Sequence, residues 1–577
     1  MKLPSRLSSL PHRSAPTLLE LDLTRGLLES PASTPLEAIQ ARRVTVLRSV
    51  VDTLRKAATD DSVGGLVAHI GRTQPTLAQS SELRAAIQDF RRHGKSAVCW
   101  SESYGEMGPG NVAYHLATAF EEIWLQPTGD VGLTGVVAQA VFVRDALDKL
   151  GIDPQIGQRH EYKSAANTFL ESTMTEPHRE MAERLVESAM QTICADIAAA
   201  RGISVDAVRA AVDRAPLSAQ EALDRGLVDR LGYRDEVYGD LRGRLGARSG
   251  ARLGARSRDV RLRYVERYGK GLAASTYRMG ASGRKKSVVA VVQATGGIHL
   301  GRSSGRSPAS GPTVGSDTVG AVLRAAGDDD HVKAVVLRID SPGGSYLASD
   351  AIRREILRLR RCGTPVVASM ASVAASGGYY IAMPADVVVA SPGTLTGSIG
   401  VLAGKQVLRD ALARIGVQRE SVASGAYAEM FSTQRPFSDI EWERLEEWLD
   451  RIYADFTTKA ANDRSMDVEA LREVAKGRVW TGADAVELGL VDQLGTLPDA
   501  VDLACARAGV TRADVAVHTV PKPGMLDRLR PAENSDAPAA ASVAQIGVGA
   551  PALEHLLNAL GLPGGGVLTM PVHWQLG

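Results

Sequence analysis

Short runs of valine, alanine and leucine alternate along the chain with amphipathic segments. The runs 334–339 (AVVLRI) and 365–368 (PVVA) are brief and apolar, as is typical of strands buried in a parallel sheet. Between them, 346–361 (YLASDAIRREILRLRR) has the apolar spacing of a helix, and a Cys-Gly pair follows it as a stop signal. Alternation of strand and helix predicts an α/β domain.

The same pattern occurs twice, at an offset of about 265 residues, which is the mark of a long internal duplication. The segment 375–401 matches 110–136, with Tyr379 opposite Tyr114. Upstream the offset is about four residues larger, which predicts a short loop insertion near residues 104–110. A chain of 577 residues is long enough for two such domains. We therefore expect two tandem α/β domains.

The two copies differ at two positions that matter chemically. Ser376 lies opposite Asn111, and Lys163 lies opposite Ala428. A serine hydroxyl is a poor nucleophile unless a base takes its proton, and a lysine can be that base when burial keeps it neutral. The ordinary alternative for any single lysine is a solvated surface charge. The reciprocal losses favour one active site divided between the two copies.

Three further motifs in the second copy suit acyl transfer. Ser376 precedes two glycines and an apolar helix-like run, so it is expected at a helix N-terminus, where unpaired N–H groups favour developing negative charge. The glycine pair 343–344 follows a predicted strand and lets the backbone approach a substrate closely. Ser398 offers a hydroxyl that can hold the lysine amine. Turns explain each motif alone, but together they favour acyl transfer.

Composition narrows the function classes. A net charge of +1 gives no general attraction to nucleic acid, and 44% hydrophobic with 23% charged residues is usual for a soluble globular protein. The four cysteines are far apart and form no CxxC, so we expect reduced thiols. The histidines lack HxxxH and HExxH spacing. We expect no metal, no cofactor and no nucleic-acid partner.

A phosphate-binding loop is suggested by the sequence Gly94-Lys95-Ser96, but its context contradicts this. Asp89 stands where the earlier glycine of such a loop belongs, and a helix-like segment precedes the motif instead of following it. We expect a helix-to-strand turn here and an activity that does not depend on ATP.

The chain divides at changes of composition. We expect a first repeat at 1–240, a basic Arg/Gly-rich linker at 241–286, a second repeat at 287–519, and a Pro/Ala-rich linker with an apolar tail at 520–577. The basic linker carries about a dozen net positive charges that repel one another, so a solvated linker is the simple interpretation. Contact with acidic lipid or RNA is the alternative.

No stretch reaches the ~20 apolar residues that cross a bilayer, and the first residues lack the apolar core of a signal peptide. The most apolar piece, Val131–Val143, is expected to be a buried strand and turn. The sequence taken alone predicts a cytoplasmic protein.

Several motifs together resemble one family. IDSPGGS, AASGGYYIA, SPGTLTGSIG and GRVWTGADAVELGLVDQLG in the second copy, with YKSAANTF in the first, resemble the long, duplicated form of the signal peptide peptidase SppA (protease IV) family. The resemblance extends over residues 19–515. It implies a ClpP/crotonase-like fold in each half and a bowl-shaped tetramer. It also implies cleavage of small, unfolded, mostly apolar peptides, including signal peptides already cut from secreted proteins.

The same resemblance implies roles for five residues. Ser376 is the expected nucleophile, Lys163 the general base, and Ser398 the hydroxyl that orients the lysine. Gly343 and Gly377 are expected to supply the oxyanion-hole amides. Many members of the family carry an N-terminal membrane anchor that this sequence does not show, which leaves peripheral contact with a membrane open.

Two other functions are compatible with such a fold. An acyl-CoA-processing crotonase-like enzyme also uses glycine loops to hold an oxyanion, but it gives no reason for the reciprocal serine and lysine. A catalytically inactive scaffold is expected to lose one of these two residues, and both are present.

Overall fold

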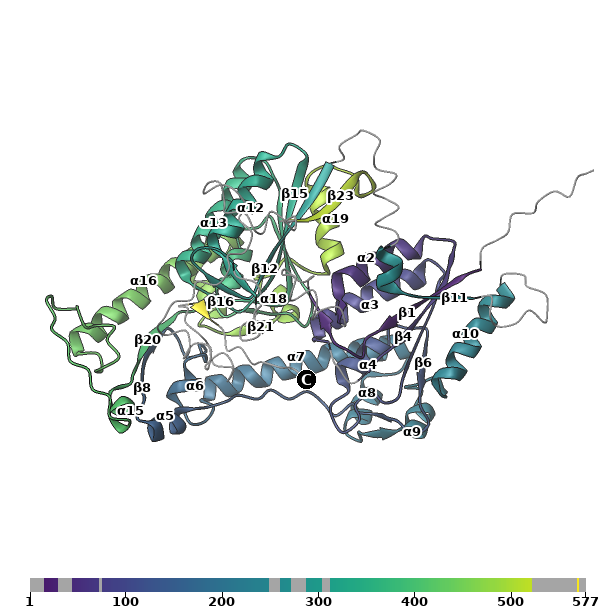
Figure 1. Ribbon diagram of the computed structural model, residues 1–577, viewed down its shortest axis with the longest axis horizontal. Helices are drawn as coiled ribbons and strands as arrows, with labels where there is room; N and C mark the ends of the chain where they lie inside the picture. Colours follow the sequence, from purple (N-terminus) through teal and green to yellow (C-terminus); the bar gives the residue numbers. More distant parts are fainter. Residues whose placement is uncertain are drawn as a thin grey trace, which may run out of the picture.

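A computed structural model describes residues 15–29, 44–71, 75–248, 260–270, 287–303, 312–520 and 568–569. Parts of two predicted segments, the basic linker at 241–286 and the Pro/Ala-rich segment with its tail at 520–577, lie outside these residues. Within the described part, each half is built from strands alternating with helices, as predicted (Figure 1).

The first half contains a six-stranded parallel sheet. Its strand order is β10-β6-β5-β4-β1-β11. The strands are β1 (Thr17–Asp22), β4 (Val63–His69), β5 (Ser96–Ser101), β6 (Glu122–Leu125), β10 (Arg230–Leu231) and β11 (Arg261–Tyr264).

The second half repeats these six strands within an eight-stranded sheet. The two additional strands are β19 (Leu395–Gly397), which pairs with β17, and β21 (Val479–Thr481), which pairs antiparallel with β19. The order β22-β18-β17-β15-β12-β23 is again parallel throughout. The strands are β12 (Ser287–Thr295), β15 (Val332–Ser341), β17 (Val366–Ala375), β18 (Val387–Ala390), β22 (Gln493–Leu494) and β23 (Val515–Val520). The prediction of tandem α/β domains from an internal duplication is confirmed. The offset changes between β5 and the next helix, where the loop insertion was expected.

Helices repeat in the same way. The pairs are α2 (Leu47–Ala58) and α12 (Ser316–Asp328), α3 (Leu77–Arg92) and α13 (Tyr346–Arg361), α4 (Asn111–Ala117) and α14 (Gly377–Ala382), and α7 (Glu176–Arg201) and α16 (Asp439–Arg464). Individual contacts repeat with them. The Tyr114 hydroxyl donates to the Leu227 carbonyl at 2.5 Å, and the Tyr379 hydroxyl donates to the Leu490 carbonyl at 3.0 Å.

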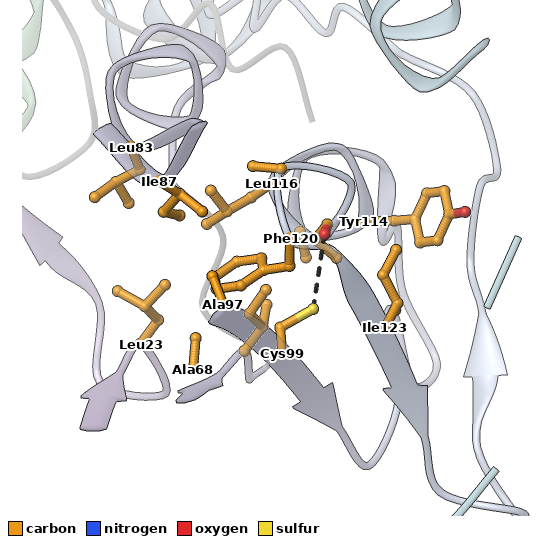
Figure 2. Packing of buried hydrophobic residues seen from close by; sticks show 14 of the residues in the cluster. Leu23, Ala68, Leu83, Ile87, Ala97, Cys99, Tyr114, Leu116, Phe120 and Ile123 are labelled. Carbon is orange, nitrogen blue, oxygen red and sulfur yellow. Dashed lines mark hydrogen bonds between the residues drawn. The ribbon is translucent and has the colours of Figure 1, made fainter. Parts of the chain in front are cut away.

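The core of the first half lies between the sheet and helices α3 and α4. Buried residues of α3 recur at positions 83, 86, 87 and 90, which is the spacing of one helix face. Figure 2 shows Leu83 and Ile87 from that face packed with Leu116 of α4, above Ala68 and Ala97 of the sheet. Burial of this apolar surface is the main force that fixes the helices on the strands.

The two halves are tied together by a ribbon and a long helix. Strand β8 (Asp153–Gln158) of the first half pairs antiparallel with β20 (Leu402–Val407) of the second. Helix α7 extends from the first sheet to the second half (Figure 1), where Met181 and Leu185 pack on Ala375. Ser188 of α7 also lies 2.7 Å from Thr481, hydroxyl to hydroxyl. The halves therefore form one packed body at this contact.

Two segments differ from the prediction. Within the apolar piece Val131–Val143, only Val131 belongs to a strand, β7 (Asp130–Val131). Val137 and Val141 are 55% and 59% exposed. At the repeat offset, residues 137–142 of this piece align with β20. They do not pair with β8, because β20 already pairs with it.

In the predicted linker, residues 241–248 belong to helix α10 (Arg234–Arg248), and β11 completes the edge of the first sheet. Its arginines suit an edge strand, where charged side chains discourage pairing with another chain.

The expected turn between α3 and β5 includes Gly94 and Lys95, and Ser96 is the first residue of β5. Lys95 Nζ donates to the carbonyls of Asp60 and Val63, both at 2.9 Å. Among the described residues, no helix is both long and apolar enough to cross a membrane.

A buried ionic contact also joins the halves. Arg338 of β15 is 3% exposed and contacts the carboxylates of Glu29 and Glu82 in the first half, at 2.7 Å and 2.6 Å. Burial raises the pKa of the Glu82 carboxyl to about 7, although Arg338 opposes that rise. The guanidinium thus balances two carboxylates at a site that water hardly reaches.

We expect Arg338→Ala to destabilise the protein by about 3–5 kcal/mol, because it leaves buried carboxylates without their counter-charge. The measurement is the urea midpoint of unfolding. Arg472→Ala is the control, since its pair with Glu469 is exposed and its removal should change stability by less than about 0.5 kcal/mol. Equal midpoints for the two variants would contradict the expectation.

Candidate active site

The lysine of the first copy and the serine of the second meet at the contact between the halves. Lys163 Nζ lies 2.9 Å from Ser376 Oγ and 3.0 Å from Ser398 Oγ, and it donates to the Ser398 carbonyl at 3.1 Å. All three residues are buried. The structure therefore brings together side chains that are 213 residues apart in the chain.

Burial sets the protonation state of the lysine. It lowers the pKa of Lys163 to about 7, because the ammonium form loses its hydration. In the neutral amine, two N–H groups can donate to the carbonyl and hydroxyl of Ser398. The lone pair then remains for the Ser376 hydroxyl, which is the arrangement that a general base requires.

Close backbone packing holds Lys163 in place. Its loop follows β8, and the Tyr162 N–H donates to the Lys476 carbonyl at 3.2 Å. Gly477 has a φ of +80°, and a Cβ there would lie 2.6 Å from the backbone nitrogen of Lys163. A Cβ on Gly400 would lie 3.1 Å from Cδ of the same lysine. Sequence reasoning did not single out either glycine, although both lie inside motifs that carry the family resemblance.

Ser376 sits at a sharp strand-to-helix turn. It follows β17 and precedes α14, with φ +55° and ψ −115°, a conformation that is uncommon for a residue with a side chain. Its N–H donates to the Gly397 carbonyl at 2.8 Å, and its carbonyl accepts from the Tyr380 N–H. Such strained positions cluster at functional sites, where the surrounding structure maintains them.

The two glycines predicted to form an oxyanion hole lie side by side. Gly343 belongs to the short strand β16 (Gly343–Gly344), and Gly377 is the first residue of α14. A Cβ on Gly377 would lie 3.1 Å from the Cα of Gly343, so the two backbones touch. The first N–H groups of a helix have no partner within it. The Gly343 N–H donates to the Ser341 hydroxyl at 3.2 Å.

The first copy uses the matching positions differently. Asn111, opposite Ser376, accepts from the Gly135 N–H at 3.1 Å and donates to its carbonyl at 2.8 Å, so its amide holds a loop. Ala428, opposite Lys163, is exposed. The serine and the lysine therefore come together at one place only in the described part of the chain.

A serine, a histidine and an aspartate also line up in the first half. Ser80 Oγ is 2.8 Å from His115 Nδ1, and His115 Nε2 is 2.7 Å from Asp196. Ser80 and His115 are fully buried, and burial lowers the pKa of His115 to about 4. The set joins helices α3, α4 and α7, and Arg84 contacts the same aspartate at 3.6 Å, so we interpret it as a hydrogen-bond network that supports the core.

Comparisons with known proteins agree with this geometry. Residues 89–247 and 358–511 match the profile described as Peptidase family S49. The chain is 33% identical over 456 residues to "Serine protease SPPA, chloroplastic" of Arabidopsis thaliana, covering 79% of this chain and 64% of that protein. It is 32% identical to "Protease 4" of Salmonella typhi and 30% identical to "Protease 4" of Haemophilus influenzae. These matches cover 80% and 79% of this chain, and 72% of each relative.

We expect Gly477→Ala to slow the labelling of Ser376 by a serine-reactive fluorophosphonate by about 100-fold, because the new methyl group displaces Lys163 by about 1 Å. Mass spectrometry of the labelled peptide gives the rate.

The matched control is Gly509→Ala. Gly509 also has a positive φ, +65°, but a Cβ there would meet nothing within 4 Å. Both variants introduce backbone strain, and only one moves the lysine. Equal labelling rates would show that Gly477 does not position Lys163.

Proposed function

The chain belongs to peptidase family S49 and is a serine protease, and on this basis we propose that Ser376 is its nucleophile and Lys163 its general base. The observation that carries the proposal is the 2.9 Å contact between Ser376 Oγ and the amine of a buried lysine whose pKa is lowered to about 7. Family membership favours this function over acyl-CoA processing and over an inactive scaffold.

The first step forms an acyl-enzyme. The Lys163 lone pair takes the Ser376 proton as Oγ attacks the peptide carbonyl carbon. The carbonyl oxygen becomes an oxyanion that accepts hydrogen bonds from the N–H groups of Gly343 and Gly377. The C–N bond then breaks, and the Lys163 ammonium gives its proton to the departing amine.

A water molecule completes the reaction. Lys163, neutral again, takes a proton from the water as it attacks the ester carbon. The intermediate collapses, and the proton returns to Ser376 Oγ, which releases the acid product. Ser398 accepts N–H bonds from the amine through both its carbonyl and its hydroxyl, and so keeps Nζ aimed at Ser376.

We propose small, unfolded, apolar peptides such as cleaved signal peptides as substrates. The burial of Ser376 and Lys163 supports this, because a folded protein cannot bring a peptide bond to them. ATP independence is supported by the turn between α3 and β5, where Lys95 Nζ is already bonded to two backbone carbonyls.

We also propose a homo-oligomer, a tetramer by the family resemblance, located in the cytoplasm or peripherally on a membrane. Its support is the apolar surface that this chain leaves uncovered on and near the segments that flank the β8–β20 ribbon. Val137, Val141 and Ile415 are 55%, 59% and 73% exposed there. Large apolar side chains left exposed are one mark of a surface that contacts another protein or a membrane.

We expect Ser376→Ala and Lys163→Ala each to lower kcat for a fluorogenic apolar peptide by at least about 1,000-fold, with the double variant hardly worse, because the two side chains act as a unit. Lys95→Ala removes a lysine that lies outside the proposed dyad and outside the β8–β20 ribbon, and should retain activity. Circular dichroism verifies that the variants are folded. Substantial activity in Lys163→Ala would refute the lysine base.

We expect kcat/KM to rise about tenfold per pH unit below about pH 7 and to level off above it, because only the neutral amine can accept the serine proton. Lys163→Arg should be inactive throughout, since a guanidinium stays protonated. A flat pH profile in the wild type, or an active arginine variant, would contradict the assignment.

A further inference from the structure

The strand that carries Gly343 has a neighbour from the far end of the chain. Strand β24 (Leu568–Thr569) pairs antiparallel with β16, with Thr569 opposite Gly343 and Leu568 opposite Gly344. The two strands lie side by side in Figure 1, where β24 is the short yellow arrow next to β16. Strand β24 is the edge strand of a sheet with the order β14-β13-β16-β24. The other two strands of this sheet are β13 (Gly297–His299) and β14 (Thr313–Gly315).

This edge is where a substrate peptide would have to bind. A peptide bond placed for attack must pass between Ser376 and the N–H groups of Gly343 and Gly377. An extended peptide that adds a strand to a sheet uses the backbone groups of the edge strand. The opposite edge of β16 is closed, because Ile298 of β13 pairs with Gly344. Substrate and β24 therefore require the same edge of β16.

The sequence around β24 suits that position. Leu568 and Thr569 stand in the stretch VLTM, which is uncharged and mostly apolar, like the peptides proposed as substrates. Pro571 follows, and it has no N–H with which to continue a ladder. The segment 521–567 connects β23 to β24, so the pairing is an intramolecular event that does not depend on protein concentration. A ladder of two residues is short enough for a longer peptide to displace.

We propose that the segment containing Leu568 and Thr569 is a built-in competitive inhibitor, which occupies the strand-addition edge of β16 and must leave before a peptide can bind. The inference rests on the proposed function, because it assigns β16 to substrate binding. Regulation then consists of any event that shifts the segment between its bound and released positions.

The test uses the full chain with both strand residues changed, Leu568→Pro and Thr569→Pro. Proline lacks the N–H that a ladder needs and disfavours strand pairing. If the bound form outnumbers the released form about tenfold, KM for a fluorogenic apolar peptide should fall about tenfold with kcat unchanged. An unchanged or higher KM would overturn the inference.

Two controls separate backbone pairing from other effects. The double variant Leu568→Ala and Thr569→Ala keeps both N–H groups and should retain the wild-type KM. If KM of the alanine variant fell as much as KM of the proline variant, the assignment would be overturned. The synthetic peptide GGVLTMP, which matches residues 565–571, should raise the KM of the proline variant without changing kcat. Its failure to inhibit would likewise overturn it.

Two further readouts distinguish this inference from the proposed function. Cleavage of the wild-type chain near residue 568 that is absent in Ser376→Ala would make the segment a substrate and refute its assignment as an inhibitor. A wild type that cleaves the reporter with the same KM as the proline variant refutes this inference alone. If neither protein cleaves the reporter or reacts with a fluorophosphonate, both proposals fall.

Discussion

The burial of one amine where the two halves meet is the constraint on which the site depends. A lysine removed from water favours its neutral form, and the same enclosure brings its nitrogen to Ser376 and Ser398. The ribbon of β8 and β20, the packing of α7 under the second sheet and the contact of Arg338 with two carboxylates all maintain that enclosure. Changes at the interface between the halves therefore act on the chemistry as well as on stability.

The two copies share their sheets, helices and a matching ion pair, and they differ where the two halves contact each other. The ion pairs Arg201–Asp229 and Arg464–Asp492, at 2.8 Å and 2.6 Å, occupy matching places in the two halves. The ribbon breaks this symmetry, because β8 comes from one copy and β20 from a different part of the other. Two similar domains can thus hold one asymmetric site, in which each contributes what the other lacks.

The sequence was sufficient for the repeated strand-and-helix pattern and for the positions of Ser376 and Lys163. Both follow from aligning one half of the chain with the other, which requires the residue pattern alone and no knowledge of tertiary contacts. The pairing of β8 with β20 was not predictable, because residues 137–142 resemble β20 and the choice of partner depends on long-range packing. The edge strand β11 was hidden by the arginines that surround it. Gly477 packs against the backbone of Lys163, which stands more than 300 positions earlier in the chain. A local sequence motif cannot indicate such a contact.

The distance along the chain between the lysine and the serine also determines when the site can exist. During synthesis Lys163 leaves the ribosome well before Ser376, which stands 213 positions later, and adding that length of chain takes about 10–40 s. Gly477, which packs on the lysine backbone, is made later still. A nascent or prematurely terminated chain thus lacks the assembled pair. Under the proposed function, division of the site delays proteolysis until the molecule is finished, while its own unfolded segments are still exposed.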